Sequence, residues 1–441
     1  MIKDVRIYPA YNSKGEHALR VKLQTGSNVF FSATIPSGTS KGKNEAKDIE
    51  MTRLADIFPK VRQNIIGLDE NDWVTADEII QQTDNSANYS NIGISLALGL
   101  SLAIAKASTA GELWKLRGAR ENFRFPMPLG NVVGGGSHGG STAWQEFLVL
   151  PYKAKSPMEA TQINFEFWKV VGEELRKGGW LVGRNIENAW TTNLDELKTL
   201  DLLSSLAGDF NVKLGVDFAA SSFWNGKTYA YKSLKKNLSP EKQIDAIARV
   251  AEVYDLYYLE DPLHEDDFEG FAELTSRLHG RLVVGDDLFC TSRERVDKGI
   301  KLKSANAAII KPNQYGTLYQ VSKVIRLMKK SGMVPIVSHR SGETEDDWLS
   351  DLALAWDSPI IKIGNLGPDV AKHSRLSELW FDIPNRQMAP LPSWAATASP
   401  AGKETDTPAS EKRLPKLPER DEEMEEALED EKWKEFTKEP E

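Results

Sequence analysis

The sequence predicts an α/β fold, with a (βα)8-like barrel preceded by a smaller α+β domain. Two observations support this fold class. From Phe125 onward, short apolar runs each end in a polar or charged residue and are followed by an amphipathic helical stretch, which is typical of alternating strands and helices. Before that point the chain begins with alternating apolar and polar residues and continues with helical patterns, which indicates a separate unit.

The first predicted domain comprises residues 1–122. Apolar and polar residues alternate from Ile2 to Ser32, with a break near Gly15, and this pattern predicts a β-hairpin or meander. A loop rich in Gly, Ser and Thr follows at residues 36–42, and helical patterns then extend from about residue 44 to residue 116. An α+β unit of about 120 residues is a common size for one domain.

The predicted barrel comprises residues 123–385. Six apolar runs end at residues that carry chemistry: Asp217, Glu260, Asp286, Lys311, His339 and Lys362. After the first interval, successive members of this set follow one another at about the length of one βα unit. Because the strands of a parallel barrel all end at the same rim, we expect these six side chains to converge at its carboxyl face, where substrate chemistry takes place.

Residues 386–441 are expected to form a flexible tail. The segment is rich in Pro, Ala, Ser and Thr and then becomes mostly charged, a composition that favours disorder. Residues 399–441 contain 15 acidic and 8 basic side chains, so they account for most of the formal net charge of -9. A solvated tail is the favoured interpretation, and docking onto a protein partner is the alternative.

Composition excludes several classes of protein. Hydrophobic residues make up 40% and charged residues 27%, as in ordinary soluble proteins, and the nearly neutral body argues against a nucleic-acid partner. Cys290 is the only cysteine, and residues 1–10 lack the pattern of a secretory signal. The richest apolar stretch, residues 94–107, is too short to cross a bilayer. We therefore expect a cytoplasmic protein without a membrane span.

Three of the strand-end residues are carboxylates, and together they indicate a metal site. Asp217, Glu260 and Asp286 form an oxygen-only set, which suits Mg²⁺ and does not suit zinc. A single Asp at a strand end has about even odds of being the N-cap of the next helix, but three at one rim make that interpretation much weaker.

The remaining strand ends point to acid–base chemistry on a phosphorylated substrate. Lys311 and Lys362 lie where a nearby metal ion would disfavour the ammonium form, so such a lysine can act as a base. Arg340 and Ser341 offer a guanidinium fork and a hydroxyl that suit a phosphate. His138 lies in a glycine-rich loop, which by itself is a weak signal.

Seven short motifs, taken in order, resemble the enolase family of phosphopyruvate hydratases, which interconvert 2-phosphoglycerate and phosphoenolpyruvate. The resemblance covers the chain from Met1 to about Trp380 and implies an enolase-type barrel with an α+β N-terminal capping domain. Its most specific stretches are residues 337–346, 260–267, 285–288, 310–314, 135–138, 145–147 and 36–42.

The resemblance implies roles for the metal and for the base. Asp217, Glu260 and Asp286 would hold a first Mg²⁺, and Ser40 would help to hold a second one against the substrate phosphate. Lys311 would remove the proton next to the substrate carboxylate. Two metal ions and Lys362 would then stabilise the resulting enolate.

The resemblance also implies how a small phosphorylated carboxylate would be held. His138, His339, Arg340 and Ser341 would bind this substrate together with Lys362, and His339 is also counted among the catalytic residues. Glu146 would be one of the two family glutamates on the side where hydroxide leaves. By the same analogy, the protein is expected to be a homodimer.

The sequence departs from the family pattern at the second glutamate. The family motif Gly-Asp-Glu-Gly-Gly is replaced by Gly183-Arg-Asn-Ile-Glu187, so that Asn185 occupies the expected position of the acid. Either Glu187 takes over through a shifted loop, or the dehydration step is altered. The second possibility motivates two alternatives: a paralogue with a related phosphorylated or phosphonate substrate, like the carboxyphosphonoenolpyruvate synthases, and a non-catalytic scaffold whose tail binds a partner.

Overall fold

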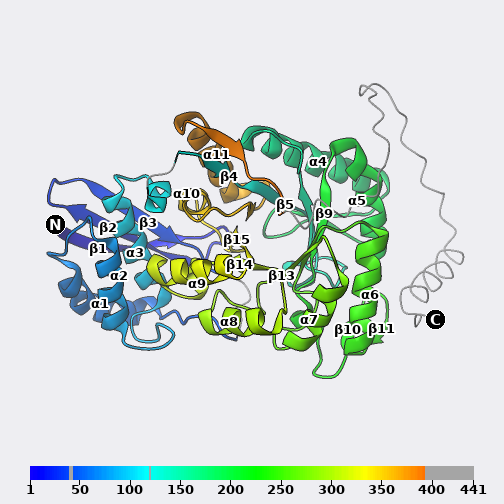
Figure 1. The fold of residues 1–441 in the computed structure, drawn as a ribbon, viewed down its shortest axis with the longest axis horizontal. Helices are drawn as coiled ribbons and strands as arrows, with labels where there is room; N and C mark the ends of the chain where they lie inside the picture. Colours follow the sequence, from blue (N-terminus) through cyan, green and yellow to red (C-terminus); the bar gives the residue numbers. More distant parts are fainter. Residues whose placement is uncertain (39–42, 119–120, 393–441) are drawn as a thin grey trace, which may run out of the picture.

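The computed structural model describes residues 1–38, 43–118 and 121–392. An N-terminal domain lies at one end of the molecule and a barrel at the other (Figure 1). The predicted fold class, a barrel preceded by an α+β domain, is confirmed.

The N-terminal domain packs helices against a three-stranded antiparallel sheet of order β1-β2-β3. The predicted strand and helix patterns are both present. α3 is apolar on almost every side, and a Cβ atom added at Gly99 would lie 2.5 Å from Cγ2 of Val21, so the helix packs very closely on β2. The elements are β1 (Ile2–Tyr11), β2 (His17–Thr25), β3 (Phe30–Ile35), α1 (Met51–Ile65), α2 (Trp73–Asp84), α3 (Ile94–Ser108) and the 3-10 helix η1 (Leu113–Arg117).

Eight strands close into a barrel through the pairing of β16 with β5. All six apolar runs singled out in the sequence form barrel strands. The strands, in spatial order, are β5 (Met127–Gly134), β6 (Glu146–Leu150), β9 (Lys213–Asp217), β12 (Tyr258–Glu260), β13 (Leu282–Gly285), β14 (Ala307–Ile310), β15 (Val334–Ser338) and β16 (Ile360–Lys362).

Helices surround the barrel (Figure 1). Several begin at an N-cap residue whose side chain accepts a hydrogen bond from a backbone amide of the first turn, such as Ser156 before α4 and Asp195 before α5. The helices are α4 (Pro157–Lys177), α5 (Glu196–Phe210), α6 (Pro240–Val253), α7 (Phe268–Arg277), α8 (Arg293–Leu302), α9 (Leu318–Lys330), α10 (Trp348–Ala355) and α11 (Val370–Asp382). Short 3-10 helices are η2 (Gly136–His138), η3 (Ala220–Phe223), η4 (Pro312–Gln314) and η5 (Gly367–Asp369). None of the helices among the described residues is long and apolar enough to span a membrane.

One barrel strand does not follow the all-parallel arrangement that the sequence predicted. β6 runs antiparallel to both β5 and β9, while the other neighbouring pairs of barrel strands are parallel. Because the direction is reversed, the first residue of β6, Glu146, lies opposite the last residue of β9, Asp217. The reversal therefore brings Glu146 to the same rim as the strand-end residues.

A hairpin extends the barrel sheet beyond β5. Its strands are β7 (Leu181–Arg184) and β8 (Trp190–Thr192), and Trp190 of β8 pairs with Val133 of β5. A second hairpin, β10 (Tyr229–Tyr231) and β11 (Lys236–Leu238), lies before α6.

The first residues of the predicted tail, residues 386–392, contact the body. β17 (Arg386–Met388) pairs in parallel with β4 (Phe123–Phe125), and the amide of Ala389 donates to the carbonyl of Phe125 at 2.8 Å. Leu391 packs against the apolar layer at the amino-terminal end of the barrel. Apolar side chains among the prolines thus bind these residues to the body, whereas residues 393–441 lie outside the described part of the chain.

Candidate active site

A cavity of about 500 Å³ opens at the carboxyl rim of the barrel. Nine of the eleven residues predicted for the site line it: His138, Glu146, Asp217, Asp286, Lys311, His339, Arg340, Ser341 and Lys362. Glu260 is fully buried behind this wall, and Ser40 lies outside the described residues. The N-terminal domain contributes Gly38, Lys43 and Glu45, so the cavity lies between the two domains.

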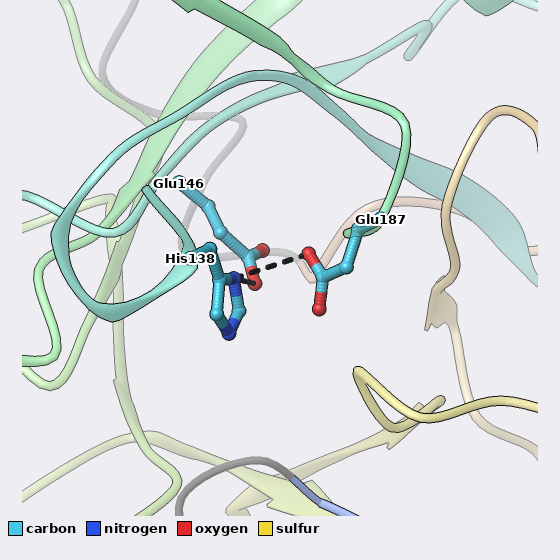
Figure 2. A group of neighbouring side chains, drawn as sticks. All are labelled: His138, Glu146 and Glu187. Carbon is cyan, nitrogen blue, oxygen red and sulfur yellow. Dashed lines mark ion pairs between the residues drawn. The ribbon is translucent and has the colours of Figure 1, made fainter. Parts of the chain in front are cut away.

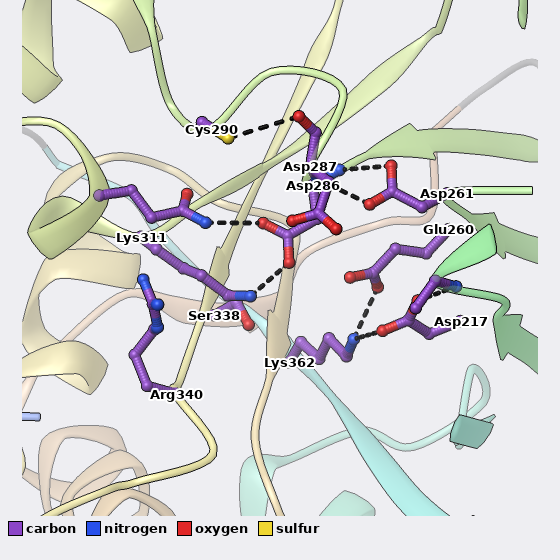
Figure 3. A network of polar contacts seen from close by, with 12 residues as sticks. Asp217, Glu260, Asp261, Asp286, Asp287, Cys290, Lys311, Ser338, Arg340 and Lys362 are labelled. Carbon is purple, nitrogen blue, oxygen red and sulfur yellow. Dashed lines mark hydrogen bonds and ion pairs between the residues drawn. The ribbon is translucent and has the colours of Figure 1, made fainter. Parts of the chain in front are cut away.

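The ammonium group of Lys362 lies among three carboxylates, two of which, those of Asp217 and Glu260, are shown in Figure 3. Its Nζ atom is 2.9 Å from Oδ2 of Asp217, 2.8 Å from Oε2 of Glu260 and 3.1 Å from Oε2 of Glu146. Burial alone would lower the pKa of Lys362, but the charges of Asp217, Glu146 and Glu260 raise it well above its ordinary value. In the protein by itself, Lys362 is therefore a fixed cation.

Lys311 lies at the end of β14 and forms an ion pair with Asp286. Burial lowers the pKa of Lys311, and the charge of Asp286 more than compensates, so the net shift is upward. Gln314 donates to the other oxygen of Asp286 at 3.1 Å, and Thr291 accepts from the backbone amide of Lys311 at 3.0 Å. These two hydrogen bonds hold the Asp286 carboxylate and the backbone of Lys311 in place.

The three predicted metal ligands fit a hard divalent cation. Oε1 of Glu260 is buried and has no hydrogen-bond partner in the described structure. Burial and the neighbouring charge of Asp217 raise the pKa of Glu260 well above its ordinary value, because several carboxylates share a poorly solvated space. A divalent ion bound by oxygen ligands relieves this crowding.

Asp261 orients Asp286 and its neighbour from behind. The amide of Asp286 donates to Oδ1 of Asp261 at 3.0 Å, and the amide of Asp287 donates to Oδ2 at 2.7 Å (Figure 3). The amide of Ala219 donates to Oδ1 of Asp217 at 3.0 Å. Backbone hydrogen bonds thus organise the carboxylate cluster before any ligand binds.

A second cluster is drawn together more tightly than the three predicted metal ligands. The ligand atoms of His138, Glu146 and Glu187 all lie within 4.8 Å of one another (Figure 2). Nδ1 of His138 is 3.4 Å from Oε2 of Glu187 and 3.8 Å from Oε1 of Glu146. Among the described residues, Asp217, Glu260 and Asp286 form no triad this close, because their oxygens face the two lysines instead.

The two glutamates of this cluster have opposite protonation tendencies. Burial and the charges of Glu187 and Asp217 raise the pKa of Glu146 to about 7. Burial also acts to raise the pKa of Glu187, but the positive charges of His138, His339 and Lys362 lower it well below its ordinary range. Near neutral pH, Glu187 is therefore ionised, while a large fraction of Glu146 carries a proton.

Cationic side chains form the wall of the cavity at the end of β15. Nδ1 of His339 is 2.7 Å from Oδ2 of Asp369. Burial alone would lower the pKa of His339, but the charge of Asp369 outweighs burial and raises this pKa to about 9. Arg340 forms an ion pair with Glu45 of the N-terminal domain at 3.0 Å. A Cβ atom added at Gly38 would lie 1.9 Å from the Arg340 guanidinium, so a larger residue there would displace this group. This arrangement suits an anionic substrate group.

The structure shows which side chain of the altered glutamate loop enters the cavity. Oδ1 of Asn185 accepts from the backbone amides of Glu187 and Ala189, at 3.0 and 2.9 Å, so its carboxamide is used within the loop. Glu187 lines the cavity and receives a hydrogen bond from Nδ2 of Asn131 at 3.0 Å. The expectation that Asn185 occupies the acid position is wrong, and the shifted loop brings Glu187 to the site.

Comparison with known families agrees with this geometry. The family model described as the enolase N-terminal domain matches residues 2–117, and the one described as the enolase C-terminal TIM barrel domain matches residues 122–379. The chain belongs to the enolase family. The family prediction made from the seven motifs is thereby confirmed.

Curated relatives carry the same family name. The chain is 38% identical to the enolase of Archaeoglobus fulgidus over 389 residues, which is 86% of this chain and 96% of that protein. It is 36% identical to the enolase of Methanothermobacter thermautotrophicus over 413 residues, or 89% of this chain and 99% of the relative. The similarity to these enolases thus extends through both domains.

Several residues that complete the site were not predicted. Glu45, Asp369 and Gln314 act on the site through Arg340, His339 and Asp286. Gln314 lies inside the Lys-Pro-Asn-Gln motif that resembles the enolase family, so the sequence offered a way to predict it. Glu45 and Asp369 lie outside strand ends, and only the folded chain brings them to their partners.

Proposed function

We propose that this protein is a Mg²⁺-dependent enolase-type lyase that interconverts 2-phosphoglycerate and phosphoenolpyruvate. The supporting observation is one cavity lined by Lys362, Lys311, carboxylates of the predicted metal site and the pair Glu146 and Glu187. Membership of the enolase family supports the same activity. The two alternatives, a phosphonate-type paralogue and a scaffold, have no such support.

In this proposal Lys311 removes the proton next to the substrate carboxylate. Lys311 must be neutral to accept this proton, so its ammonium, which pairs with Asp286 in the protein by itself, must first lose a proton to solvent. Asp217, Glu260 and Asp286 would hold Mg²⁺, which would supply positive charge near the enolate and would disfavour the ammonium form of the nearby base. Lys362 remains a cation and stabilises the same negative charge.

Hydroxide leaves on the opposite side of the carbanion, where Glu146 and Glu187 lie. The protonated form of Glu146 can donate to the leaving hydroxyl, since its pKa is raised to about 7. The ionised Glu187 holds His138 and keeps the imidazole facing the pair. His339, Arg340 and Ser341 bind the phosphate and carboxylate groups of the substrate.

The further properties that this function implies are also proposals. Two Mg²⁺ ions would be used, the second with Ser40, and the enzyme would act in glycolysis in the cytoplasm. A homodimer is proposed by analogy with the family. We place the domain boundaries at residues 1–122 and 123–385, and the role of the remaining segment as a partner-binding tail stays a prediction.

The function is tested by following phosphoenolpyruvate formation in the ultraviolet with purified protein, 2-phosphoglycerate and Mg²⁺. We expect turnover in the parent, loss on chelation of Mg²⁺, and a loss of about 10³-fold or more in Lys311→Ala. We expect Glu146→Gln to lower kcat by about 10²- to 10⁴-fold, because the amide cannot donate a proton as an acid does. Absence of product at high concentrations of the parent enzyme would contradict the proposal.

A further inference from the structure

The segment that delivers Glu187 is a short loop, residues 185–189, between β7 and β8. The amide of Asn185 donates to the carbonyl of Ala189 at 2.9 Å, and the amide of Asn188 donates to the carbonyl of Asn185 at 3.0 Å. Ile186 at its tip is 38% exposed, whereas Glu187 is only 7% exposed. The loop therefore turns one side chain outward and the next one into the cavity.

The first restraint on this loop is the side chain of Asn185. Its Oδ1 atom accepts hydrogen bonds from the backbone amides of Glu187 and Ala189, and these bonds fix the backbone on either side of Asn188. Asn188 has a φ of 65°, a left-handed conformation that asparagine tolerates better than most residues. The closed loop leaves the Glu187 side chain little freedom of direction.

The second restraint is the contact between Asn185 and Gly134. A Cβ atom at Gly134 would lie 2.1 Å from Nδ2 of Asn185 and 3.0 Å from its Cγ, so the carboxamide rests directly on the glycine. Gly134 is also the residue opposite Glu146 in the pairing of β5 with β6. Gly134 thus contacts both the strand that carries Glu146 and the loop that carries Glu187.

The third restraint is a pair of tryptophans. Nε1 of Trp168, on α4, donates to the carbonyl of Asn188 at 3.1 Å, and Nε1 of Trp190 donates to the carbonyl of Trp168 at 2.7 Å. The two rings stack with centroids 4.2 Å apart, and the Arg184 guanidinium lies 5.8 and 5.7 Å from them. A Cβ atom at Gly172 would lie 2.4 Å from the Trp190 ring, which leaves no room for the stack to shift.

We propose that Asn185 and Trp168 are positioning residues that hold the Glu187 carboxylate against His138 and Glu146 for the departure of hydroxide. Neither side chain lines the cavity, so both act through the loop backbone. The inference rests on the proposed function, because it concerns the half of the reaction that follows proton removal by Lys311.

Kinetics on the full-length enzyme test the proposal with Asn185→Ala and Trp168→Phe. The first change removes the acceptor, and the second keeps an aromatic ring but removes the N–H donor. We expect each to lower kcat for phosphoenolpyruvate formation by tenfold or more with KM changed less than threefold. Asn185→Asp, which keeps an acceptor oxygen, should restore most of kcat, and Trp380→Phe, the same change in a ring that packs on Phe125, should leave it unchanged.

Exchange of the C2 hydrogen of 2-phosphoglycerate with D₂O separates positioning from a general structural loss. Exchange reports proton removal by Lys311, so the ratio of exchange to product formation should rise in both variants. Equal losses of exchange and product, or normal kcat in both variants, would overturn the inference while leaving the proposed function intact.

A measurement without substrate covers the case in which the parent itself is inactive and the proposed function fails. The charge of Glu187 contributes to a raised pKa of His138, so displacement of the carboxylate should lower that pKa in an NMR titration of the imidazole. Glu187→Gln provides the reference for complete loss of the charge. An unchanged His138 titration in Asn185→Ala and Trp168→Phe would overturn the inference.

Discussion

At the scale of single residues, the site pairs each of its two lysines with carboxylates before substrate arrives. Lys362 satisfies Asp217, Glu260 and Glu146, and Lys311 satisfies Asp286. A buried charge without a partner is strongly destabilising, so the two lysines and the carboxylates that remain ionised depend on one another. The cavity is therefore preorganised for charge stabilisation, which is the property that formation of an enolate requires.

Asp369 controls the charge of His339, and Asp369→Asn tests this control. Without the carboxylate, the pKa of His339 should fall from about 9 toward or below its ordinary value, because burial is then less opposed. At pH 6 more of the imidazole is protonated than at pH 8, so KM for 2-phosphoglycerate should rise as pH increases across this interval in the variant and change little in the parent. Steady-state kinetics at both pH values provide the measurement, and parallel KM profiles would contradict the assignment.

At the scale of secondary-structure elements, two departures from a regular barrel bring the second half of the chemistry to the rim. The antiparallel strand β6 presents Glu146, and the β7–β8 hairpin presents Glu187. Neither residue is the last residue of a parallel strand, so the rule that locates Asp217 or Lys362 does not locate them. The two elements meet at Gly134, where β5 contacts both.

Gly134→Ala should displace the hairpin. The added methyl group would collide with Asn185, whose backbone cannot retreat without breaking the loop, so we expect kcat to fall by about tenfold or more with a modest loss of stability. Gly208→Ala is the matched control, because a Cβ there, within α5, meets nothing within 4 Å. That control should stabilise the protein by about 0.5 to 1 kcal/mol without altering kcat. Equal activities of the two variants would show that the contact has no functional role.

At the scale of the whole molecule, the active site requires the two domains to be held in a fixed position relative to each other. Arg340 of the barrel pairs with Glu45 of the N-terminal domain, and Asn313 donates to the carbonyl of Pro36 at 2.8 Å. A second junction lies between α2, α3 and α9. There Asp77 is 1% exposed and accepts from Ser101 at 3.0 Å and from the amide of Tyr319 at 2.8 Å. The junction connects the domains at a distance from the cavity rim.

Asp77 makes the stability of this junction dependent on pH. Burial raises its pKa to about 7, so the folded protein binds a proton that the unfolded chain has lost above pH 4. The contribution of Asp77 to the free energy of unfolding is therefore most favourable at acid pH and declines as pH rises from about 4 to 7. Asp77→Asn should remove this decline, by on the order of 1 kcal/mol or more.

Urea denaturation of the parent and of Asp77→Asn at pH 5 and pH 8 measures the effect. The relevant quantity is the change in the free energy difference between the two proteins across pH, since the substitution itself also alters a buried hydrogen-bond network. A difference that is the same at both pH values would show that Asp77 does not titrate in this interval.

The sequence by itself determined the fold class, the family and most of the residues that line the cavity. Apolar runs that end in Asp217, Glu260, Asp286, Lys311, His339 and Lys362 could be read directly, because strand periodicity and the common rim of a parallel barrel are local rules. The same rules described the hairpin and helices of the N-terminal domain. Such strand and helix patterns can be recognised from residues that are close together in the sequence.

Only the tertiary structure decided which loop residue enters the cavity and which charge each buried group carries. Asn185 was expected at the acid position, but contacts with Gly134 and with its own loop turn it away and bring Glu187 in. The pairing of Asp369 with His339 and the pairing of residues 386–389 with β4 likewise join residues that are far apart in the chain. The physical reason is that side-chain direction and pKa depend on the surroundings in three dimensions, which periodicity along the chain does not describe.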